Sequence, residues 1–195
     1  MNPTKIAAIL HQRIAPGGPF IIGIDGAGGA GKSVLADQVA GELMSRAHAV
    51  ALIKMDDFYQ PNSAPNRGPS TIGAGFDWRR LEKQVLKPAK SNQPIQYQRY
   101  DWTTDSLEEW HEASARVVIV EGIYSTRIEL EEFYDFTIWV ECPRRIRLAR
   151  GVQRDGESVR DRWLNEWMPE EDRYVAEHSP QTRADLVYDG SGRNR

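Results

Sequence analysis

The sequence has one cysteine, no long hydrophobic run and no excess of charge of either sign. Cys142 cannot form an internal disulfide or a cysteine-built zinc site, so the fold does not depend on an oxidising compartment. No apolar run approaches the roughly 18 residues that span a bilayer, and no signal-peptide pattern opens the sequence. We therefore expect a cytoplasmic protein with no membrane partner.

The charges nearly cancel, because 25 Lys and Arg residues face 28 Asp and Glu residues, a net charge of −3. This balance argues against a broadly basic nucleic-acid binder, so no nucleic-acid partner is expected. Within the basic residues, arginine outnumbers lysine 19 to 6, and five arginines cluster between residues 144 and 154. Arginine presents a planar fork that binds carboxylate or phosphate at two points. The cluster is therefore a candidate phosphate-binding surface.

With 195 residues and 40% hydrophobic residues, the chain can bury a proper core, and we expect a single domain over residues 1–195. Short apolar runs predict buried strands at 20–24, 49–55, 116–120 and 136–140, and residues 185–188 predict a last strand. Between them, apolar periodicity predicts helices at 3–15, 32–46, 79–87 (ending at Pro88), 144–154 and 158–175. Residues 60–75, rich in Pro, Gly, Asn and Ser, predict a loop. This alternation predicts a three-layer α/β/α fold around a parallel sheet of about five strands.

A glycine-rich turn follows the first predicted strand, and its sequence GAGGAGKS fits the phosphate-loop pattern G-x-x-x-x-G-K-[ST]. Glycines let the backbone N–H groups face inward around a phosphate at the positive end of a helix. Lys32 would reach the β- and γ-phosphates, and the Ser33 hydroxyl would coordinate Mg²⁺. The predicted ATP-binding residues are Gly26, Ala27, Gly28, Gly29, Ala30, Gly31, Lys32, Ser33 and Val34.

Acidic residues follow two other predicted strands, at the edge where ligands bind to parallel sheets. Asp56 could accept a proton from an attacking hydroxyl or hold Mg²⁺ through water. Glu121, after the run VVIV, fits the acid that positions the metal in phosphate-loop proteins. The alternatives are an ordinary pair of turn acids at Asp56 and Asp57, and a solvated strand-end Glu121.

An aromatic and polar group between these strands is a candidate acceptor pocket. It comprises Asp77 and Trp78, and then Arg99, Tyr100 and Trp102 in the stretch YQRYDW. The alternative is a peripheral hydrophobic cluster in which Asp77 caps the helix expected near Arg79.

Taken in order, the motifs resemble the uridine kinase-like group of phosphate-loop kinases, which are relatives of phosphoribulokinase. The resemblance covers roughly residues 18–190 and rests on GAGGAGKS, DDFY at 56–59, FDW at 76–78 and YQRYDW at 97–102. It continues through VVIVEGIY at 117–124, the stretch R-L-x-R-x-x-x-R-D at 147–155 and DLVYDG at 185–190. It implies an acceptor-binding insert at about 58–112 and a helical lid at about 144–175.

The resemblance also implies roles for single residues. Asp56 matches the catalytic acid, Tyr59 a pocket aromatic and Asp77 the carboxylate that holds sugar hydroxyls. Glu121 matches the metal-side acid. Lid arginines that close over ATP are matched by Arg147, Arg150 and Arg154. Such arginines can stabilise the charge of a phosphoryl group in transfer, and a closed lid excludes water. On the residues alone, the arginine run could equally be a solvated helix face paired with the acids at 155–172.

The sequence departs from the uridine kinases at one site: where they carry a pyrimidine-contacting His after the Tyr-Asp of this stretch, it has Asp105. We therefore expect an ATP- and Mg²⁺-dependent kinase that phosphorylates a hydroxyl of a nucleoside-like or other small metabolite. A regulatory NTPase acting through a protein partner is the alternative, although no N-K-x-D motif is present. Adenylate-type kinases remain open through Arg67, Arg79, Arg80 and Arg99, and so does a homo-oligomer.

Overall fold

A five-stranded parallel sheet forms the centre of the protein. The computed structural model describes residues 1–64 and 72–192 of the chain. The sheet has the order β2-β5-β1-β6-β7. Its strands are β1 (Phe20–Asp25), β2 (Val50–Lys54), β5 (Val117–Glu121), β6 (Phe136–Glu141) and β7 (Leu186–Asp189). The five predicted strands are confirmed, and β5 separates β1 from β2.

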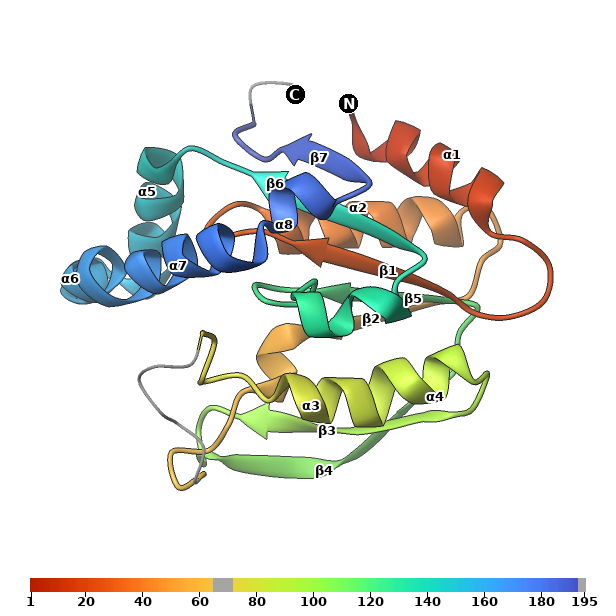
Figure 1. Cartoon of the computed structure of the whole chain (residues 1–195), viewed down its shortest axis with the longest axis horizontal. Helices are drawn as coiled ribbons and strands as arrows, with labels where there is room; N and C mark the ends of the chain where they lie inside the picture. The colour runs from red at the N-terminus through yellow and green to blue at the C-terminus, as the bar shows by residue number, and fades with distance from the viewer. Residues whose placement is uncertain (65–71, 193–195) are drawn as a thin grey trace.

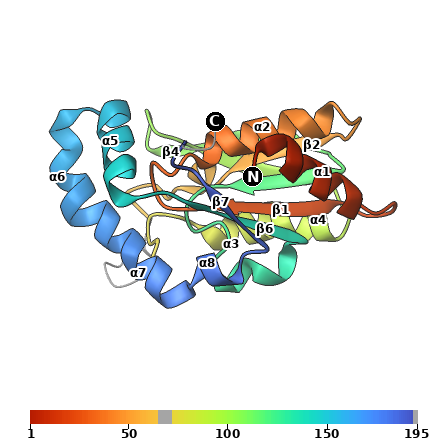
Figure 2. The same cartoon turned by 90° about the horizontal axis from the view of Figure 1, so that it is seen from above.

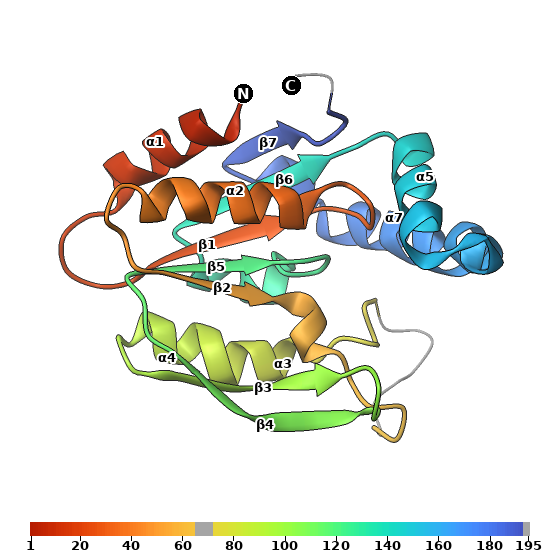
Figure 3. The same cartoon turned by 180° about the vertical axis from the view of Figure 1, so that it is seen from behind.

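Both faces of the central strands β1 and β5 are buried, as the continuous apolar runs predicted, whereas the edge strand β7 is partly exposed. In β1, Ile22 and Ile24 pack into the core under α1 (Pro3–Arg13) and α2 (Lys32–Met44). Ile21, the residue before Ile22, packs into the opposite core with Leu81 and Leu130. Figures 1 and 3 show the resulting layers, with α1 and α2 on one side of the sheet and α3 and α4 on the other. The predicted three-layer α/β/α fold is confirmed.

The helical run on the second face is longer than expected. It consists of α3 (Trp78–Leu81), the π-helical segment η2 (Glu82–Leu86) and α4 (Lys87–Lys90). The prediction that the helix ends at Pro88 is wrong. The N–H of Lys87 donates to the Glu82 carbonyl five residues back, and Pro88 follows in the first turn of α4. A proline at that position has no N–H that would need a partner, so the helical direction continues.

An antiparallel hairpin that the sequence analysis did not predict lies outside this helical run (Figure 1). It pairs β3 (Ile95–Asp101) with β4 (Ser106–Ala113). Ile95 and Tyr97 face the core, where the Tyr97 ring stacks on Phe58 at a centroid distance of 5.8 Å. Strand β4 is mostly exposed and rich in glutamate, so it has no apolar alternation by which a strand could be recognised.

The chain between β6 and β7 forms a group of helices that extends past the carboxyl ends of the strands (Figure 2). It starts with α5 (Arg144–Asp155) and ends with α7 (Met168–His178) and α8 (Pro180–Arg183). The single helix predicted at 158–175 is instead the succession of η4 (Glu157–Val159), α6 (Arg160–Arg162), the π-helical segment η5 (Trp163–Trp167) and α7. We call residues 144–178 the lid segment. Within residues 1–64 and 72–192, every helix is too short or too polar to cross a membrane.

Candidate functional site

The phosphate loop lies between β1 and α2, where the sequence motif placed it. Gly29 adopts φ +73°, and a Cβ built on it would lie 2.5 Å from the carbonyl oxygen of Arg147. Only glycine combines this backbone with so close an approach of α5. The Lys32 Nζ donates to the carbonyl of Ala27 at 3.1 Å, so the lysine curls back over the loop. Loop, lysine and helix N-terminus together form an anion-binding cradle.

The two strand-end acids follow β5 and β2, which lie next to each other on the same side of β1. Glu121, the last residue of β5, is buried, and its Oε1 accepts a 3.1 Å hydrogen bond from the Ser33 hydroxyl. Burial raises the pKa of the Glu121 carboxyl, while the Lys32 charge opposes that shift. Asp56 lies in the turn after β2 with an exposed side chain, whereas Asp57 is partly buried and interacts with the charges of Arg99 and Lys54. Burial raises the pKa of Asp57.

These oxygens suit a magnesium ion that is bound mainly by phosphates and water. Ser33, Glu121 and Asp56 all line one cavity. In the part of the chain that the structure describes, no three His, Cys, Asp or Glu side chains cluster into a metal cage. Mg²⁺ ordinarily takes one or two protein oxygens together with substrate phosphates. The donor set therefore fits Mg²⁺ carried in with a nucleotide.

The cavity has a volume of about 500 Å³ and connects the phosphate loop, the strand ends and the lid segment. Gly28, Gly29 and Lys32 line it on the side of the phosphate loop, and Asp56 and Glu121 line it at the strand ends. Six further lining residues are aromatic: Tyr59, Phe76, Trp102, Tyr124, Trp163 and Trp167. Five more are charged: Arg154, Asp155, Arg162, Glu170 and Glu171. A concave, partly open space that combines aromatic walls with charged groups fits a small-molecule site.

Two of the predicted acceptor residues line this cavity. Tyr59 and Trp102 place their ring centroids 4.6 Å apart, and Trp102 is 62% exposed at the rim. Tyr100 packs against the Trp102 ring from outside the cavity lining, and its hydroxyl donates to Asp105 at 2.7 Å. Asp105 has φ 51° in the β3–β4 turn and also accepts from the N–H of Asn62. Asp105 is thus a turn residue that holds the hairpin to the preceding loop.

Three predicted acceptor residues are placed elsewhere in the described structure. Asp77 is the N-cap of α3 and accepts from the N–H of Arg80 at 3.0 Å, as in the alternative considered from the sequence. Trp78 lies between the guanidinium groups of Arg79 and Arg127. Arg99 contacts Glu108 and His111 of the hairpin.

The arginine cluster divides into different environments. Arg154 lines the cavity and pairs with Asp155 at 2.6 Å. Arg147 is buried against Glu171. Arg150 lies behind the phosphate loop, and its guanidinium donates to the carbonyls of Gly29, Ala30, Gly190 and Ser191. Arg144 forms a surface pair with Asp172, as the solvated-face alternative anticipated. Cys142, beside Arg150, is a buried thiol.

Several residues of this site were missed by sequence reasoning. Asp25, which directly precedes the phosphate loop, is fully buried, and its partners Thr126 and Tyr174 lie 101 and 149 residues away. Glu171 of α7 accepts from the phosphate loop itself. The strand-end position of Asp25 was a usable signal, whereas nothing local to Glu171 distinguishes it from the neighbouring acids.

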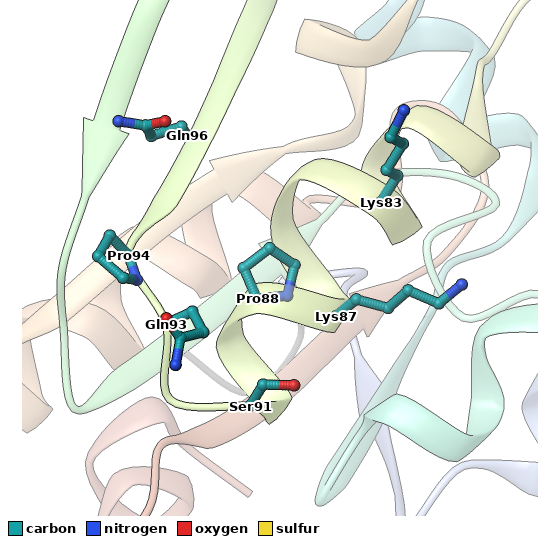
Figure 4. Close-up of a pocket in the computed structure, with 7 residues that line it drawn as sticks. All are labelled: Lys83, Lys87, Pro88, Ser91, Gln93, Pro94 and Gln96. Carbon is teal, nitrogen blue, oxygen red and sulfur yellow. The ribbon is translucent and has the colours of Figure 1, made fainter.

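A second hollow, of about 420 Å³, lies between the end of α4 and the start of β3 (Figure 4). Lys87, one of its lining residues, points away from Gln93 and Pro94 in this view and pairs with Glu82 at 2.7 Å. The residues that line it are lysines, prolines, amides and one serine, with no acid or aromatic side chain among them, so it offers no convergent chemistry. The cavity at the phosphate loop is therefore the candidate functional site.

Comparison with known proteins decides the family. Residues 21–190 match the Phosphoribulokinase / Uridine kinase family. The chain belongs to this family. Membership identifies the protein as a phosphotransferase that uses a nucleotide and a hydroxyl acceptor on a small molecule, and the expected resemblance is confirmed.

Curated relatives agree with this assignment. The chain is 29% identical over 192 residues to a uridine kinase of Lactobacillus helveticus, a match that covers 90% of this chain and 89% of the relative. It is 32% identical over 147 residues to uridine-cytidine kinase B of Dictyostelium discoideum, covering 70% of this chain but 58% of that longer protein.

Solved structures share the fold of this kinase. A candidate fructose transport system kinase from Silicibacter sp. TM1040 superposes with a TM-score of 0.81 at 22% identity, covering 96% of this chain and 99% of that one. A possible uridine kinase from Bacillus stearothermophilus gives a TM-score of 0.75 at 23% identity, covering 96% and 97%. At these identities the likeness concerns the fold alone.

Proposed function

We propose that this kinase transfers the γ-phosphoryl group of ATP, bound with Mg²⁺, to a hydroxyl of an uncharged, nucleoside-like small metabolite. One observation carries the proposal: Asp56 and the phosphate loop face the same cavity, with Glu121 between them. The carboxylate of Asp56 accepts the proton of the acceptor hydroxyl as that oxygen attacks the γ-phosphorus. Lys32 and Arg154 stabilise the charge that spreads over the phosphoryl oxygens.

Ser33 and Glu121 would hold the magnesium ion, which neutralises phosphate charge when it is bound. Residues 144–175 act as the lid that excludes water from the transferring group. Residues 58–112, which carry Tyr59 and Trp102, act as the acceptor-binding insert within a single domain. Tyr59 and Trp102 present ring faces to the acceptor. Because uridine kinases are among the relatives, nucleosides are the first acceptors to test.

The charges of the cavity favour a neutral acceptor over a phosphorylated one. A kinase that phosphorylates a phosphate needs arginines on the acceptor side of its pocket. Arg79 stacks on Trp78, and Arg80 donates to the backbone carbonyls of Gln98, Asp57 and Tyr59. Among the described residues, the arginines that line the cavity are Arg154 and Arg162 of the lid segment, while Arg67 lies outside the described residues. An anionic acceptor would meet Asp56 and be repelled.

A coupled assay with ATP and Mg²⁺ tests the proposal. The acceptor panel contains nucleosides, vitamins, sugars and sugar acids, together with nucleoside monophosphates, and EDTA serves as the control for metal dependence. We expect phosphorylation of at least one neutral hydroxyl compound and none of the monophosphates. Phosphorylation of monophosphates alone would instead support the adenylate-type alternative. ATP hydrolysis that no small molecule stimulates, but a protein partner does, would support the regulatory alternative.

A further inference from the structure

A carboxylate of the lid segment rests on the phosphate loop. The N–H of Gly28 donates to Oε1 of Glu171 at 2.9 Å, and Arg147 Nη1 donates to Oε2 of the same side chain at 2.9 Å. Glu171 is 6% exposed and Arg147 is 7% exposed, so this contact is closed to solvent. A carboxylate that bridges a loop N–H and a guanidinium makes the contacts that a phosphate oxygen makes in such a loop.

The contact is sterically tight as well as charged. A Cβ built on Gly28 would lie 2.6 Å from Oε1 of Glu171 and 2.8 Å from Cη2 of Trp163. The lid segment therefore lies directly on the loop backbone, with no space for a further group at Gly28. Lys32 acts on Glu171 through its charge, which opposes the rise that burial causes in the pKa of this carboxyl. The glutamate thus pairs directly with Arg147 and also interacts with the charge of Lys32.

We propose that Glu171 is a resident anion of the phosphate loop, which holds the lid segment against the loop and which the triphosphate of an incoming nucleotide displaces. The inference rests on the proposed function only for the identity of the ligand, a nucleoside triphosphate. On displacement, phosphate oxygens accept from the Gly28 N–H and pair with Arg147. Each donor exchanges one anion for another, so neither is left unpaired in a buried site.

The structure restricts how Glu171 can leave. Tyr174, one helical turn further along α7, donates to the buried carboxylate of Asp25 at 2.6 Å. This end of α7 is therefore fixed to the strand that leads into the phosphate loop. On the other side of Glu171, the π-helical segment Trp163–Trp167 interrupts the regular hydrogen-bond pattern of the helix. Glu171 therefore leaves by rotation of its side chain, with any backbone adjustment taken up in that segment.

Binding of inorganic tripolyphosphate to the full chain, measured by isothermal titration calorimetry without acceptor, tests the proposal. Glu171→Gln keeps the shape of the side chain but removes the competing charge, and we expect it to bind tripolyphosphate about 5-fold tighter or more. Asp172→Asn is the matched control, because Asp172 is the next residue of the same helix, is exposed, and pairs with Arg144 away from the cavity. It should bind as the wild type does. Equal or weaker binding by Glu171→Gln overturns the proposal.

Removing Glu171 alone leaves Arg147 buried without its anion, which could prevent folding. The comparison is therefore repeated between Arg147→Gln and the double variant Arg147→Gln/Glu171→Gln. Neither variant contains the Arg147 guanidinium, so no buried cation is left unpaired. The double variant should bind tripolyphosphate more tightly than the single one, and equal binding again overturns the proposal. Since these measurements need no acceptor and no turnover, an acceptor panel that yields no product would contradict the proposed function while leaving this result intact.

Discussion

The hydroxyl of Tyr174 donates a 2.6 Å hydrogen bond to Oδ2 of Asp25, which joins the lid segment to the strand that carries the phosphate loop. The same carboxylate accepts from the N–H and hydroxyl of Thr126 and, through Oδ1, from the N–H of Gly26. Asp25 is completely buried. Three segments that meet the nucleotide site are thus held by one carboxylate, and four donors offset the cost of burying it.

Tyr174→Phe should lower the free energy of unfolding at pH 7 by about 1.5–3 kcal/mol, because it removes one hydrogen bond to a buried carboxylate. Burial raises the pKa of Asp25 above its ordinary 3.8, so the stability linked to this group is present below that pH and declines as the pH rises through the folded-state pKa. The tyrosine hydroxyl opposes this rise in pKa. The loss should therefore be larger at pH 7 than at pH 4. Urea unfolding at both values measures this, and equal losses would contradict the account.

Asp56→Asn should lower turnover by about 10²–10⁴-fold while ATP still binds, because the variant cannot accept the hydroxyl proton. Asp57→Asn is the matched control. Its carboxyl lies outside the lining of the cavity, so neutralising it should leave turnover near that of the wild type. Steady-state rates with an acceptor from the panel, and calorimetric ATP affinities, measure both. If Asp57→Asn has the larger effect, the assignment of the base is reversed.

The arginines of α5 should separate activity from stability. Arg154→Met should lower turnover by about 10²-fold with little change in unfolding, since its side chain is 68% exposed and faces the cavity. Arg150→Met should instead lower the free energy of unfolding by about 2 kcal/mol or more, because it releases buried carbonyls of the phosphate loop and of the residues after β7. Turnover and urea unfolding are measured for each. Equal profiles for the two variants would refute this division.

Gly151→Ala should destabilise the lid segment by about 1–3 kcal/mol. A Cβ at residue 151 would lie 2.4 Å from the ring of Trp163, which is 2% exposed and has no room to move. Alanine ordinarily stabilises a helix relative to glycine, so a loss of stability on a Gly→Ala substitution within a helix is the opposite of the usual effect. Gly41→Ala in α2 is the control, because no atom lies within 4 Å of its Cβ position, and it should stabilise by about 0.5–1 kcal/mol. Thermal unfolding followed by tryptophan fluorescence compares the two.

The sequence alone determined the phosphate loop, the five strands of the sheet and the family, because the motifs that indicate them are local. A glycine pattern between an apolar run and a helix is complete within about 15 residues. Continuous apolar runs indicate strands that are buried on both faces wherever they lie in the sheet. The same local reasoning placed Asp56 and Glu121 at strand ends, and the structure places both in the cavity.

Only the tertiary structure decided which of several similar side chains face the cavity. Arg150 and Arg154 have the same chemistry and lie one helical turn apart, yet one donates to loop carbonyls and the other lines the cavity. From the sequence, Asp77 fits a helix cap as well as a ligand contact. Because α3 starts at Trp78, Asp77 is its N-cap. The contacts of Asp25 and Glu171 join residues more than 100 positions apart. Such contacts exist only once helices and strands pack, because packing and not sequence proximity brings the donors and acceptors together.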